Sequence, residues 1–294
     1  MKKMLLTIAG VGGVTLLCCL SFLVVRLLTD DGSFGSGKMV GVVEVKGIIL
    51  DSQESIRRLR ECGKNDRVKA VVLRIDSPGG VVAPSQEIYE EVQRLAGKKK
   101  VVVSMGSVAA SGGYYIAAPA SVIYANPGTI TGSIGVIIKL SNLQELMEKV
   151  GMKVTTIKTG KYKDIGSTSR PMTEEDRALL QGVIESSYGQ FVKAVAQGRR
   201  LPEAQVRLLA DGRIFTGEQA LALKLVDRLG NMQDAVAEAG RLAGIEGEPP
   251  MFRPKKERKL LDLLVEETVS QLGGMARQQG FSLNYELDAA LPGR

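Results

Sequence analysis

The chain has 294 residues, enough for one α/β domain with additional helices or for two small domains. It contains no histidine, which excludes a Ser-His-Asp triad, a Cys-His dyad and any metal site with a histidine ligand. The net charge of +7 comes from scattered basic residues, and with no Trp, six Phe and seven Tyr we expect no nucleic-acid partner. The three cysteines (Cys18, Cys19 and Cys62) lack zinc-site spacing, so we also expect no metal and no cofactor.

The N-terminus carries a long apolar run. Lys2 and Lys3 precede 22 uncharged residues, 4–25, which end at Arg26. As a helix this run would span about 33 Å, close to the hydrocarbon thickness of roughly 30 Å. No A-x-A cleavage site follows it, which favours an uncleaved anchor over a signal peptide. We therefore expect a single-pass anchor in the cytoplasmic membrane over residues 1–28, a linker over 29–39, and the remaining chain on the extracytoplasmic side.

From residue 40 onward, strand-like and helix-like patterns alternate. β-Branched runs predict strands at 40–45, 68–75, 101–104, 122–124, 134–138 and 154–157. Helical patterns lie between them at 53–61, 84–95 and 143–150, and further helices are predicted to start at Thr173 and Thr216. This alternation predicts an α/β fold with a mainly parallel sheet, followed by a helical second half.

Three loops rich in glycine and other small residues each follow a predicted strand, at residues 76–80, 106–113 and 126–133. The carboxyl ends of parallel strands meet along one edge of a sheet, which is where such folds bind ligands. Small residues let backbone N–H groups come close to a bound molecule. The sequence therefore predicts a functional site along this edge.

Ser111 is the candidate nucleophile at that edge. Small residues flank it on both sides, and the segment that follows has the pattern of a helix start. The N–H groups of Gly80 and Gly112 could together stabilise a tetrahedral oxyanion. The alternative is that Ser111 only caps the following helix, which is the commoner role of serine at such a position.

A serine nucleophile needs a base, and without histidine the candidates are Lys, Asp and Glu. A lysine base must be largely neutral, although the ordinary lysine pKa is about 10.4 and burial or nearby cations lower it by about 3. Lys158, Lys161 and Lys163 all lie just after the strand predicted at 154–157. The pattern of residues alone does not choose among these three.

Four segments together resemble the SppA-type signal peptide peptidases: DSPGG at 76–80, SMGSVAASGGYY at 104–115, TGSIGV at 131–136 and KTGKYKD at 158–164. Their order and spacing match the family, as does DGR at 211–213, and the likeness covers residues 40 to 244. The chain looks like the short, single-repeat form of this family. The resemblance implies the Clp-protease and crotonase fold, with its repeated β-β-α core.

The resemblance also implies roles for individual residues. Matched position by position, the nucleophile falls on Ser111, the lysine base on Lys163, the oxyanion glycine on Gly80, and the serine that hydrogen-bonds the lysine amine on Ser133. In short family members the serine and the lysine of one site come from neighbouring subunits of a ring, which implies a homo-oligomer, an octamer.

The implied activity is that of a membrane-anchored serine endopeptidase that degrades remnant signal peptides and other small peptides. Its protease domain would cover residues 40–249, and the role of the extension at 250–294 stays open, with an amphipathic helix expected at 260–269.

Two other functions compete with this one. A crotonase-type acyl-CoA enzyme shares the fold but usually needs a carboxylate base, and Asp76 is the only carboxylate in the three Gly-rich loops. A catalytically inactive membrane scaffold of the same fold would not need both Ser111 and Lys163.

Overall fold

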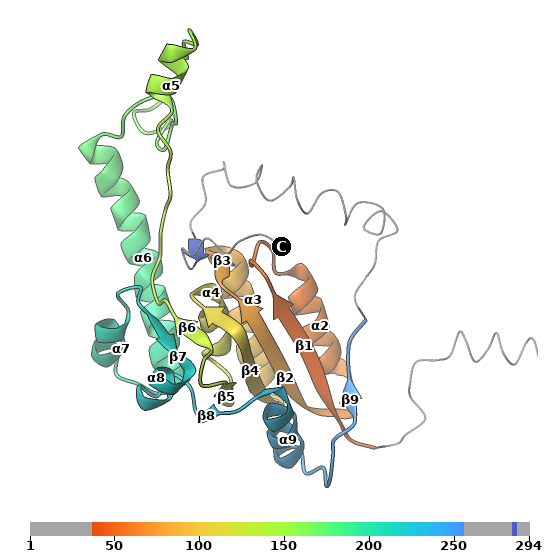
Figure 1. The fold of residues 1–294 in the computed structure, drawn as a ribbon. Coiled ribbons are helices and arrows are strands. Elements are labelled where there is room, and N and C mark those ends of the chain that lie inside the picture. Colours follow the sequence, from red (N-terminus) through yellow and green to blue (C-terminus); the bar gives the residue numbers. More distant parts are fainter. Residues whose placement is uncertain (1–36, 256–283, 287–294) are drawn as a thin grey trace, which may run out of the picture. The chain divides into compact units, whose positions relative to one another are not determined.

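The structure, a computed structural model, describes residues 37–255 and 284–286 (Figure 1). Its strands are β1 (Met39–Lys46), β2 (Val68–Ser77), β3 (Gly79–Val81), β4 (Lys100–Ala110), β5 (Val122–Ala125), β6 (Ile130–Gly132), β7 (Ile214–Thr216), β8 (Arg228–Leu229), β9 (Met251–Phe252) and β10 (Asn284–Glu286). Its helices are α2 (Gln53–Lys64), α3 (Val82–Ala96), α4 (Gly112–Ala117), α5 (Gln144–Lys149), α6 (Glu174–Arg199), α7 (Glu203–Leu209), α8 (Gly217–Ala222) and α9 (Met232–Leu242).

The main sheet is largely parallel, as the alternation of elements predicts. Its strands follow the order β7-β6-β4-β2-β1-β9, and β5 pairs with both β4 and β8. The exception to parallel pairing is β7, which runs antiparallel to β6. Strand β4 is central, because its first half pairs with β5 and its last three residues pair with β6.

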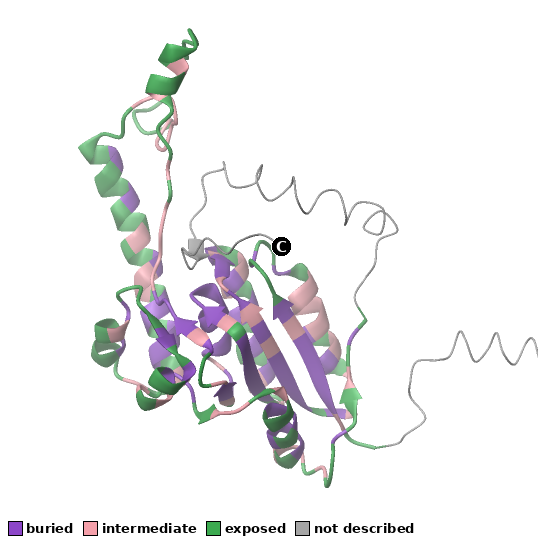
Figure 2. Cartoon of the chain, in the orientation of Figure 1, coloured by how far each residue is buried: buried purple, intermediate pink, exposed green. Residues whose placement is uncertain are grey.

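Helices cover both faces of this sheet. Val71, Leu73 and Ile75 of β2 point into a core shared with α2, α3, α4 and α6, and all three are fully buried. The alternate residues Ala70 and Val72 pack on the opposite face against α9. Burial on both faces explains why the strands read as continuous apolar runs, and Figure 2 shows the sheet as the buried centre of the molecule.

The helix starts predicted at Thr173 and Thr216 are confirmed. The Thr173 hydroxyl accepts a hydrogen bond from the Asp176 N–H, and the Asp176 carboxylate accepts one from the Thr173 N–H. Thr216 and Gln219 form the same reciprocal cap on α8. The helices predicted at 53–61, 84–95 and 143–150 correspond to α2, α3 and α5.

Two strand predictions are wrong. Residues 134–138 and 154–157 form no strand. Most of them, 136–138 and 154–157, belong to a projecting arm, residues 136–173, that carries α5 at its tip (Figure 1). Ile134 is buried in the core and Val136 packs against it, whereas the β-branched side chains of residues 154–157 are exposed. Val154 is 52% exposed and Ile157 is 97% exposed.

The Gly-rich segments are also more regular than predicted. Strand β4 does not end at residue 104 but continues to Ala110, because its small residues let it pair closely with β6. Strands β3 and β6 likewise form inside the segments 76–80 and 126–133 that were expected to be loops. The three segments therefore reach the site as strand ends with short turns.

The anchor predicted at residues 1–28 and the helix predicted at 260–269 lie outside the described residues. Within the part that the structure describes, no helix has the length and apolar character needed to cross a membrane. Two short segments of the predicted C-terminal extension are strands. β9 pairs with β1, and β10 pairs antiparallel with β3.

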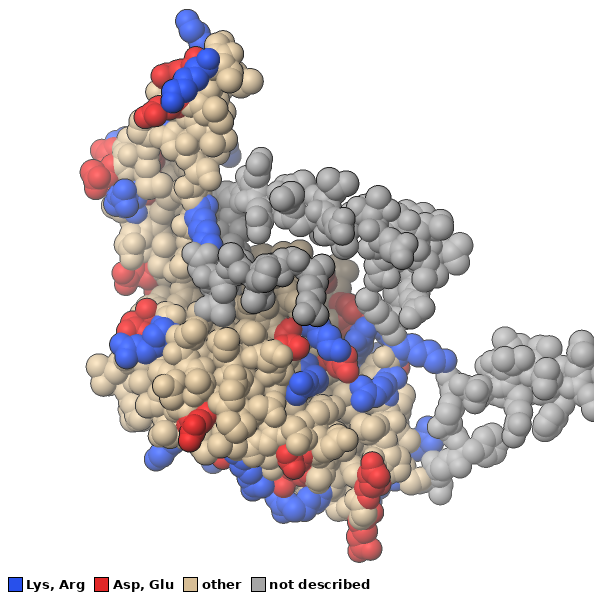
Figure 3. Space-filling model, in the orientation of Figure 1, with Lys and Arg blue, Asp and Glu red and all other residues tan. Residues whose placement is uncertain are grey.

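Charged side chains of both signs are interspersed over the face shown in Figure 3. Some form ion pairs, such as Arg60 with Glu91 at 3.0 Å between α2 and α3. These two residues line a surface hollow of about 770 Å³ that does not include Ser111.

Cys62 is fully buried on α2, and burial raises the pKa of its thiol to about 12, so its role is packing.

Candidate active site

Ser111 lies at the junction where β4 ends and α4 begins. Its backbone has φ 53° and ψ −118°, a combination that side-chain-bearing residues rarely adopt. Two hydrogen bonds hold it there: the Ser111 N–H donates to the Gly132 carbonyl at 2.8 Å, and its own carbonyl accepts from the Tyr115 N–H at 2.8 Å. Backbone strain of this kind clusters at functional sites and persists only where the surrounding structure enforces it.

Helix α4 fixes the junction from the other side, since all six of its residues are buried. The Tyr115 ring packs against Tyr89 of α3 and Phe191 of α6, each with ring centroids 4.9 Å apart. The Tyr114 hydroxyl donates to the Leu225 carbonyl at 2.8 Å. The turn at Ser111 is therefore anchored in the core and does not depend on surface contacts.

The Ser111 hydroxyl is buried and has no hydrogen-bond partner among the residues that the structure describes. The residue is 1% exposed and occupies the N-cap position of α4, yet its side chain makes no capping bond. A buried, unpaired hydroxyl costs free energy, about 1–3 kcal/mol. The geometry thus argues against the capping role and favours a hydroxyl held ready for a bound molecule.

Gly80 brings a backbone N–H next to this turn. The Ile49 N–H donates to the Gly79 carbonyl and the Val81 N–H donates to the Ile49 carbonyl, both at 2.8 Å. Because hydrogen-bonding groups alternate along a strand, the N–H and carbonyl of Gly80 point to the opposite edge of β3. A Cβ on Gly112 would lie 3.2 Å from the Gly80 nitrogen, so the two predicted oxyanion residues are neighbours.

In the structure, an extended segment of the same chain occupies this second edge of β3. Strand β10 pairs with it in antiparallel register, with Tyr285 opposite Gly80, and also lies against α3 and α4. The edge is therefore shaped for an added peptide strand whose backbone runs past the Ser111 turn.

Ser133 is connected to the Ser111 turn through one residue. It follows Gly132, whose carbonyl accepts the Ser111 N–H, and it is itself buried with φ 50°. Its N–H donates to the Arg213 carbonyl at 2.8 Å. Hydrogen bonds from Arg213 lower the pKa of Asp211 to about 2, and this pair gives the DGR segment a structural role in holding Ser133.

The structure distinguishes the three candidate lysines. Lys158 binds the Asp164 carboxylate at 2.5 Å, and Lys161 binds Glu175 at 2.8 Å, which raises the pKa of Lys161. The Lys163 side chain is exposed and forms no ion pair or hydrogen bond within the described part of the chain. Of the three, Lys163 is the one whose amine is left available.

The predicted site residues do not all meet in one chain. The Ser111 turn, Gly80, Gly112 and Ser133 come together at the ends of β3, β4 and β6. Lys163 instead lies on the arm, exposed, and does not hydrogen-bond the buried Ser111 hydroxyl. Within the described residues of a single chain, the predicted nucleophile and oxyanion residues thus lie together, and the predicted base lies apart from them.

Asp76 is engaged in the sheet. Its Oδ1 accepts the Val108 N–H at 3.1 Å, and a Cβ on Gly106 would lie 2.6 Å from its carboxyl carbon. The carboxylate therefore helps to join β2 to β4, and this speaks against its use as the base of an acyl-CoA enzyme.

Comparisons with known proteins agree with this geometry. The sequence profile of peptidase family S49 matches residues 93–246, and that of Clp protease matches residues 50–128. A candidate protease of Synechocystis sp. is 45% identical over 83% of this chain and 89% of its own length. A candidate signal peptide peptidase SppA of Enterococcus faecium is 35% identical over 82% of this chain and 70% of its own length. The chloroplastic serine protease SPPA of Arabidopsis thaliana is 35% identical over 75% of this chain but 32% of its own length.

We predict that Gly80→Ala will lower both the stability and the activity of the protein. The new Cβ would lie 2.1 Å from the Ile49 carbonyl oxygen, so β3 must shift away from the Ser111 turn. Overpacking of this kind typically costs about 1–3 kcal/mol. Chemical denaturation and peptide hydrolysis would measure the two effects. Gly128→Ala is the matched control, because nothing lies within 4 Å of its Cβ; equal behaviour of the two variants would contradict the prediction.

Proposed function

We propose a catalytic mechanism from the premise that this chain belongs to peptidase family S49 and is a serine peptidase. In it, Ser111 is the nucleophile and Lys163 the general base. The observation that carries the proposal is the Ser111 hydroxyl, buried, unpaired and held in a strained turn beside the backbone of Gly80 and Gly112.

In the first step, Lys163 takes the proton of the Ser111 hydroxyl as Oγ attacks the scissile carbonyl carbon. The N–H groups of Gly80 and Gly112 stabilise the oxyanion of the tetrahedral intermediate. Lys163 then passes the proton to the leaving amine, and an acyl-enzyme remains on Ser111. Water, deprotonated by the same lysine, hydrolyses this ester. Ser133 hydrogen-bonds the lysine amine and orients it.

The base comes from a neighbouring copy of the chain in this proposal. Lys163 lies on the projecting arm, while Ser111 is buried at the sheet edge. Apolar side chains are exposed along the arm and the adjoining part of α6, and contiguous exposed apolar surface marks sites of association. They include Leu146, Val150, Met152, Val154, Ile157, Leu179 and Val183. Docking the arms into a ring of copies, an octamer in our proposal, would cover them and bring Lys163 to a partner's Ser111.

The substrates we propose are extended peptides, in particular remnant signal peptides. The edge of β3 pairs with the extended strand β10, and in our proposal an unfolded substrate segment takes the place of β10 and binds there through its backbone. The alanines and glycines around Ser111 leave room for small or apolar side chains beside the scissile bond. The name of the relative from Enterococcus faecium points to the same substrate class.

We also propose that residues 1–28 anchor the protein in the cytoplasmic membrane, with the protease domain on the extracytoplasmic side. The support is the uncharged run at residues 4–25 behind Lys2 and Lys3. An anchor there would keep the enzyme close to signal peptides left in the membrane after secretion.

Removing either member of the Ser111–Lys163 pair should abolish hydrolysis of a synthetic signal peptide, since the two act as a unit. Lys163→Arg should fail as well, because a guanidinium keeps its proton. Lys158→Ala and Lys161→Ala should retain most of the activity. In the wild type, activity should rise from neutral toward alkaline pH, because the base works only after losing its proton.

A fluorophosphonate probe separates a peptidase from an inactive scaffold. The proposal requires a covalent adduct on Ser111, located by mass spectrometry, and no adduct in Ser111→Ala. Near-normal turnover by Ser111→Ala, or an unlabelled wild type, would overturn the assignment.

Mixing inactive variants tests the shared site. Ser111→Ala subunits still supply Lys163, and Lys163→Ala subunits still supply Ser111, so mixed oligomers should regain part of the wild-type activity. Each variant alone should stay inactive. If the pair acted within one chain, no mixture would regain activity.

The anchor prediction is checked by fractionation. The full-length protein should sediment with membranes, and deleting residues 1–37 should release an active protein into the soluble fraction. Recovery of the intact full-length chain mainly in the soluble fraction would contradict the anchor.

A further inference from the structure

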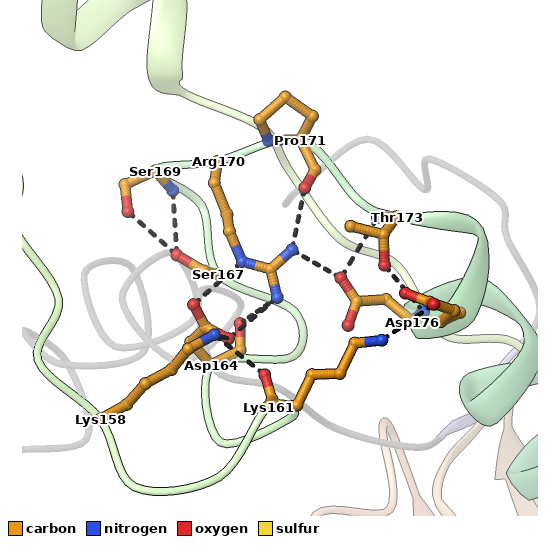
Figure 4. A network of polar contacts seen from close by, with 10 residues as sticks. Lys158, Lys161, Asp164, Ser167, Ser169, Arg170, Pro171, Thr173 and Asp176 are labelled. Carbon is orange, nitrogen blue, oxygen red and sulfur yellow. Dashed lines mark hydrogen bonds and ion pairs between the residues drawn. The ribbon is translucent and has the colours of Figure 1, made fainter.

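A network of charged side chains surrounds the stretch of the arm that carries Lys163 (Figure 4). Its centre is Arg170. The Arg170 guanidinium donates two hydrogen bonds to the carboxylate of Asp164, the residue that follows Lys163. The two bonds, Nε to Oδ2 and Nη2 to Oδ1, are both 3.0 Å long, and Nη2 also reaches the Asp164 carbonyl at 3.2 Å. A two-pronged contact of this kind fixes the direction of the carboxylate as well as its distance.

The other side of Arg170 is tied to helix α6. Its Nη1 donates to the Asp176 carboxylate at 2.5 Å and to the Pro171 carbonyl at 2.9 Å. Asp176 is 2% exposed and caps α6 together with Thr173. A continuous chain of hydrogen bonds therefore runs from a long helix, through Arg170, to the residue beside Lys163.

The Lys163 segment has one further tie to α6, the ion pair of Lys161 with Glu175, and otherwise only local contacts such as Lys158 with Asp164. It lies between Gly160 and Gly166, which have φ of 82° and 78°, and it contains turns without a helix or strand. The Lys163 N–H makes only a long bond to the Gly160 carbonyl, at 3.5 Å. Arg170 ties the residue directly after Lys163 to α6, and without it the flexible glycine at position 166 would let the backbone on that side of Lys163 reorient.

The network also determines what Asp164 can bind. Hydrogen bonds from Arg170 and Lys158 hold the pKa of Asp164 well below its usual range, so the carboxylate stays ionised. Both of its oxygens are occupied by these two cations. The charge of Asp164 is therefore balanced by Lys158 and Arg170, and Lys163, its neighbour in the chain, is not among its partners.

We propose that Arg170 is a positioning residue that fixes where the arm presents Lys163 to the partner subunit's site. This inference rests on the proposed function, because it assumes that Lys163 is the base. Arg170 touches no reacting atom, and it acts through Asp164 and the backbone between them. Its loss should therefore slow the chemical step while leaving the binding of peptide to the partner's β3 edge intact.

Steady-state kinetics of Arg170→Ala should show kcat lowered about 10-fold to 100-fold, the scale expected for a catalytic group displaced by about 1 Å, with KM nearly unchanged. Fluorophosphonate labelling of Ser111 should slow in parallel. Arg170→Lys should recover little, because an ammonium cannot make the two-pronged contact. Arg177→Ala is the matched control: Arg177 lies in the first turn of α6, is mostly exposed and makes only a loose ion pair with Glu174. It should behave as wild type.

Asp164→Asn gives a second variant should Arg170→Ala fold poorly. It keeps the shape of the side chain while weakening both of its charged contacts, and the same loss in kcat is expected. Light scattering and thermal unfolding must show that each variant assembles and folds as the wild type does. Two outcomes would overturn the positioning role alone, provided that Lys163→Ala is inactive. One is a raised KM with kcat unchanged, and the other is an unchanged kcat in both variants. An active Lys163→Ala would overturn the proposed function itself.

Mixed oligomers provide the sharpest readout. When Ser111→Ala and Lys163→Ala subunits are combined, the working lysine belongs to the Ser111→Ala subunit. Adding Arg170→Ala to that subunit should remove most of the regained activity, whereas adding it to the Lys163→Ala subunit should not. A merely structural role would lower the activity equally in both combinations and would contradict the proposal.

Discussion

The pairing of the last residues of β4 determines the geometry of the whole site. Val108, Ala109 and Ala110 pair with β6 on one side, and Ala109 also pairs with Ser77 of β2 on the other. This pairing on both sides restricts the backbone conformation of Ser111. Its N–H still donates to the Gly132 carbonyl of β6, while the next residue, Gly112, already belongs to α4. The strained backbone of Ser111 is the consequence. This backbone alone sets the direction of the hydroxyl, which has no hydrogen-bond partner among the described residues.

Small residues make this arrangement possible because they let backbones approach where side chains would normally separate them. A Cβ on Gly80 would collide with the Ile49 carbonyl, one on Gly112 would press on Ser85, and one on Gly113 would press on the Ser77 carbonyl. The site is thus built from main-chain groups at fixed positions, and such groups need no reorganisation when charge develops on a substrate.

The arm follows a different principle. The sheet is held by buried apolar side chains, whereas the Lys163 segment is held by Arg170, Asp164 and Asp176 at the start of α6. A lysine in such a segment can be oriented without being buried in its own chain. The exposed apolar residues of the arm, such as Ile157, then become the surface through which a second copy completes the site in our proposal.

Most local features of this protein follow from its sequence. The alternating pattern predicts the parallel sheet, Thr173 and Thr216 predict two helix starts, and the small residues around Ser111 predict a close backbone turn, because each depends on neighbours in the chain. The absence of histidine restricts the base to lysine or a carboxylate. Residues 134–138 and 154–157 were mistaken for strands, since β-branched character shows a preference but not whether a partner strand exists.

Other features depend on contacts between distant parts of the chain. Only the fold shows that the Ser111 hydroxyl does not cap α4 and that Asp76 is used within the sheet. It also shows that, among the described residues, Lys158 and Lys161 are paired while Lys163 is not. Sequence reasoning also missed Arg170, although an arginine between two aspartates six residues away on either side is a detectable signal. Composition and spacing determined which chemistry this chain can perform. The tertiary structure decided which of the three candidate lysines is left without a partner among the described residues, because that depends on how the arm folds against the start of α6.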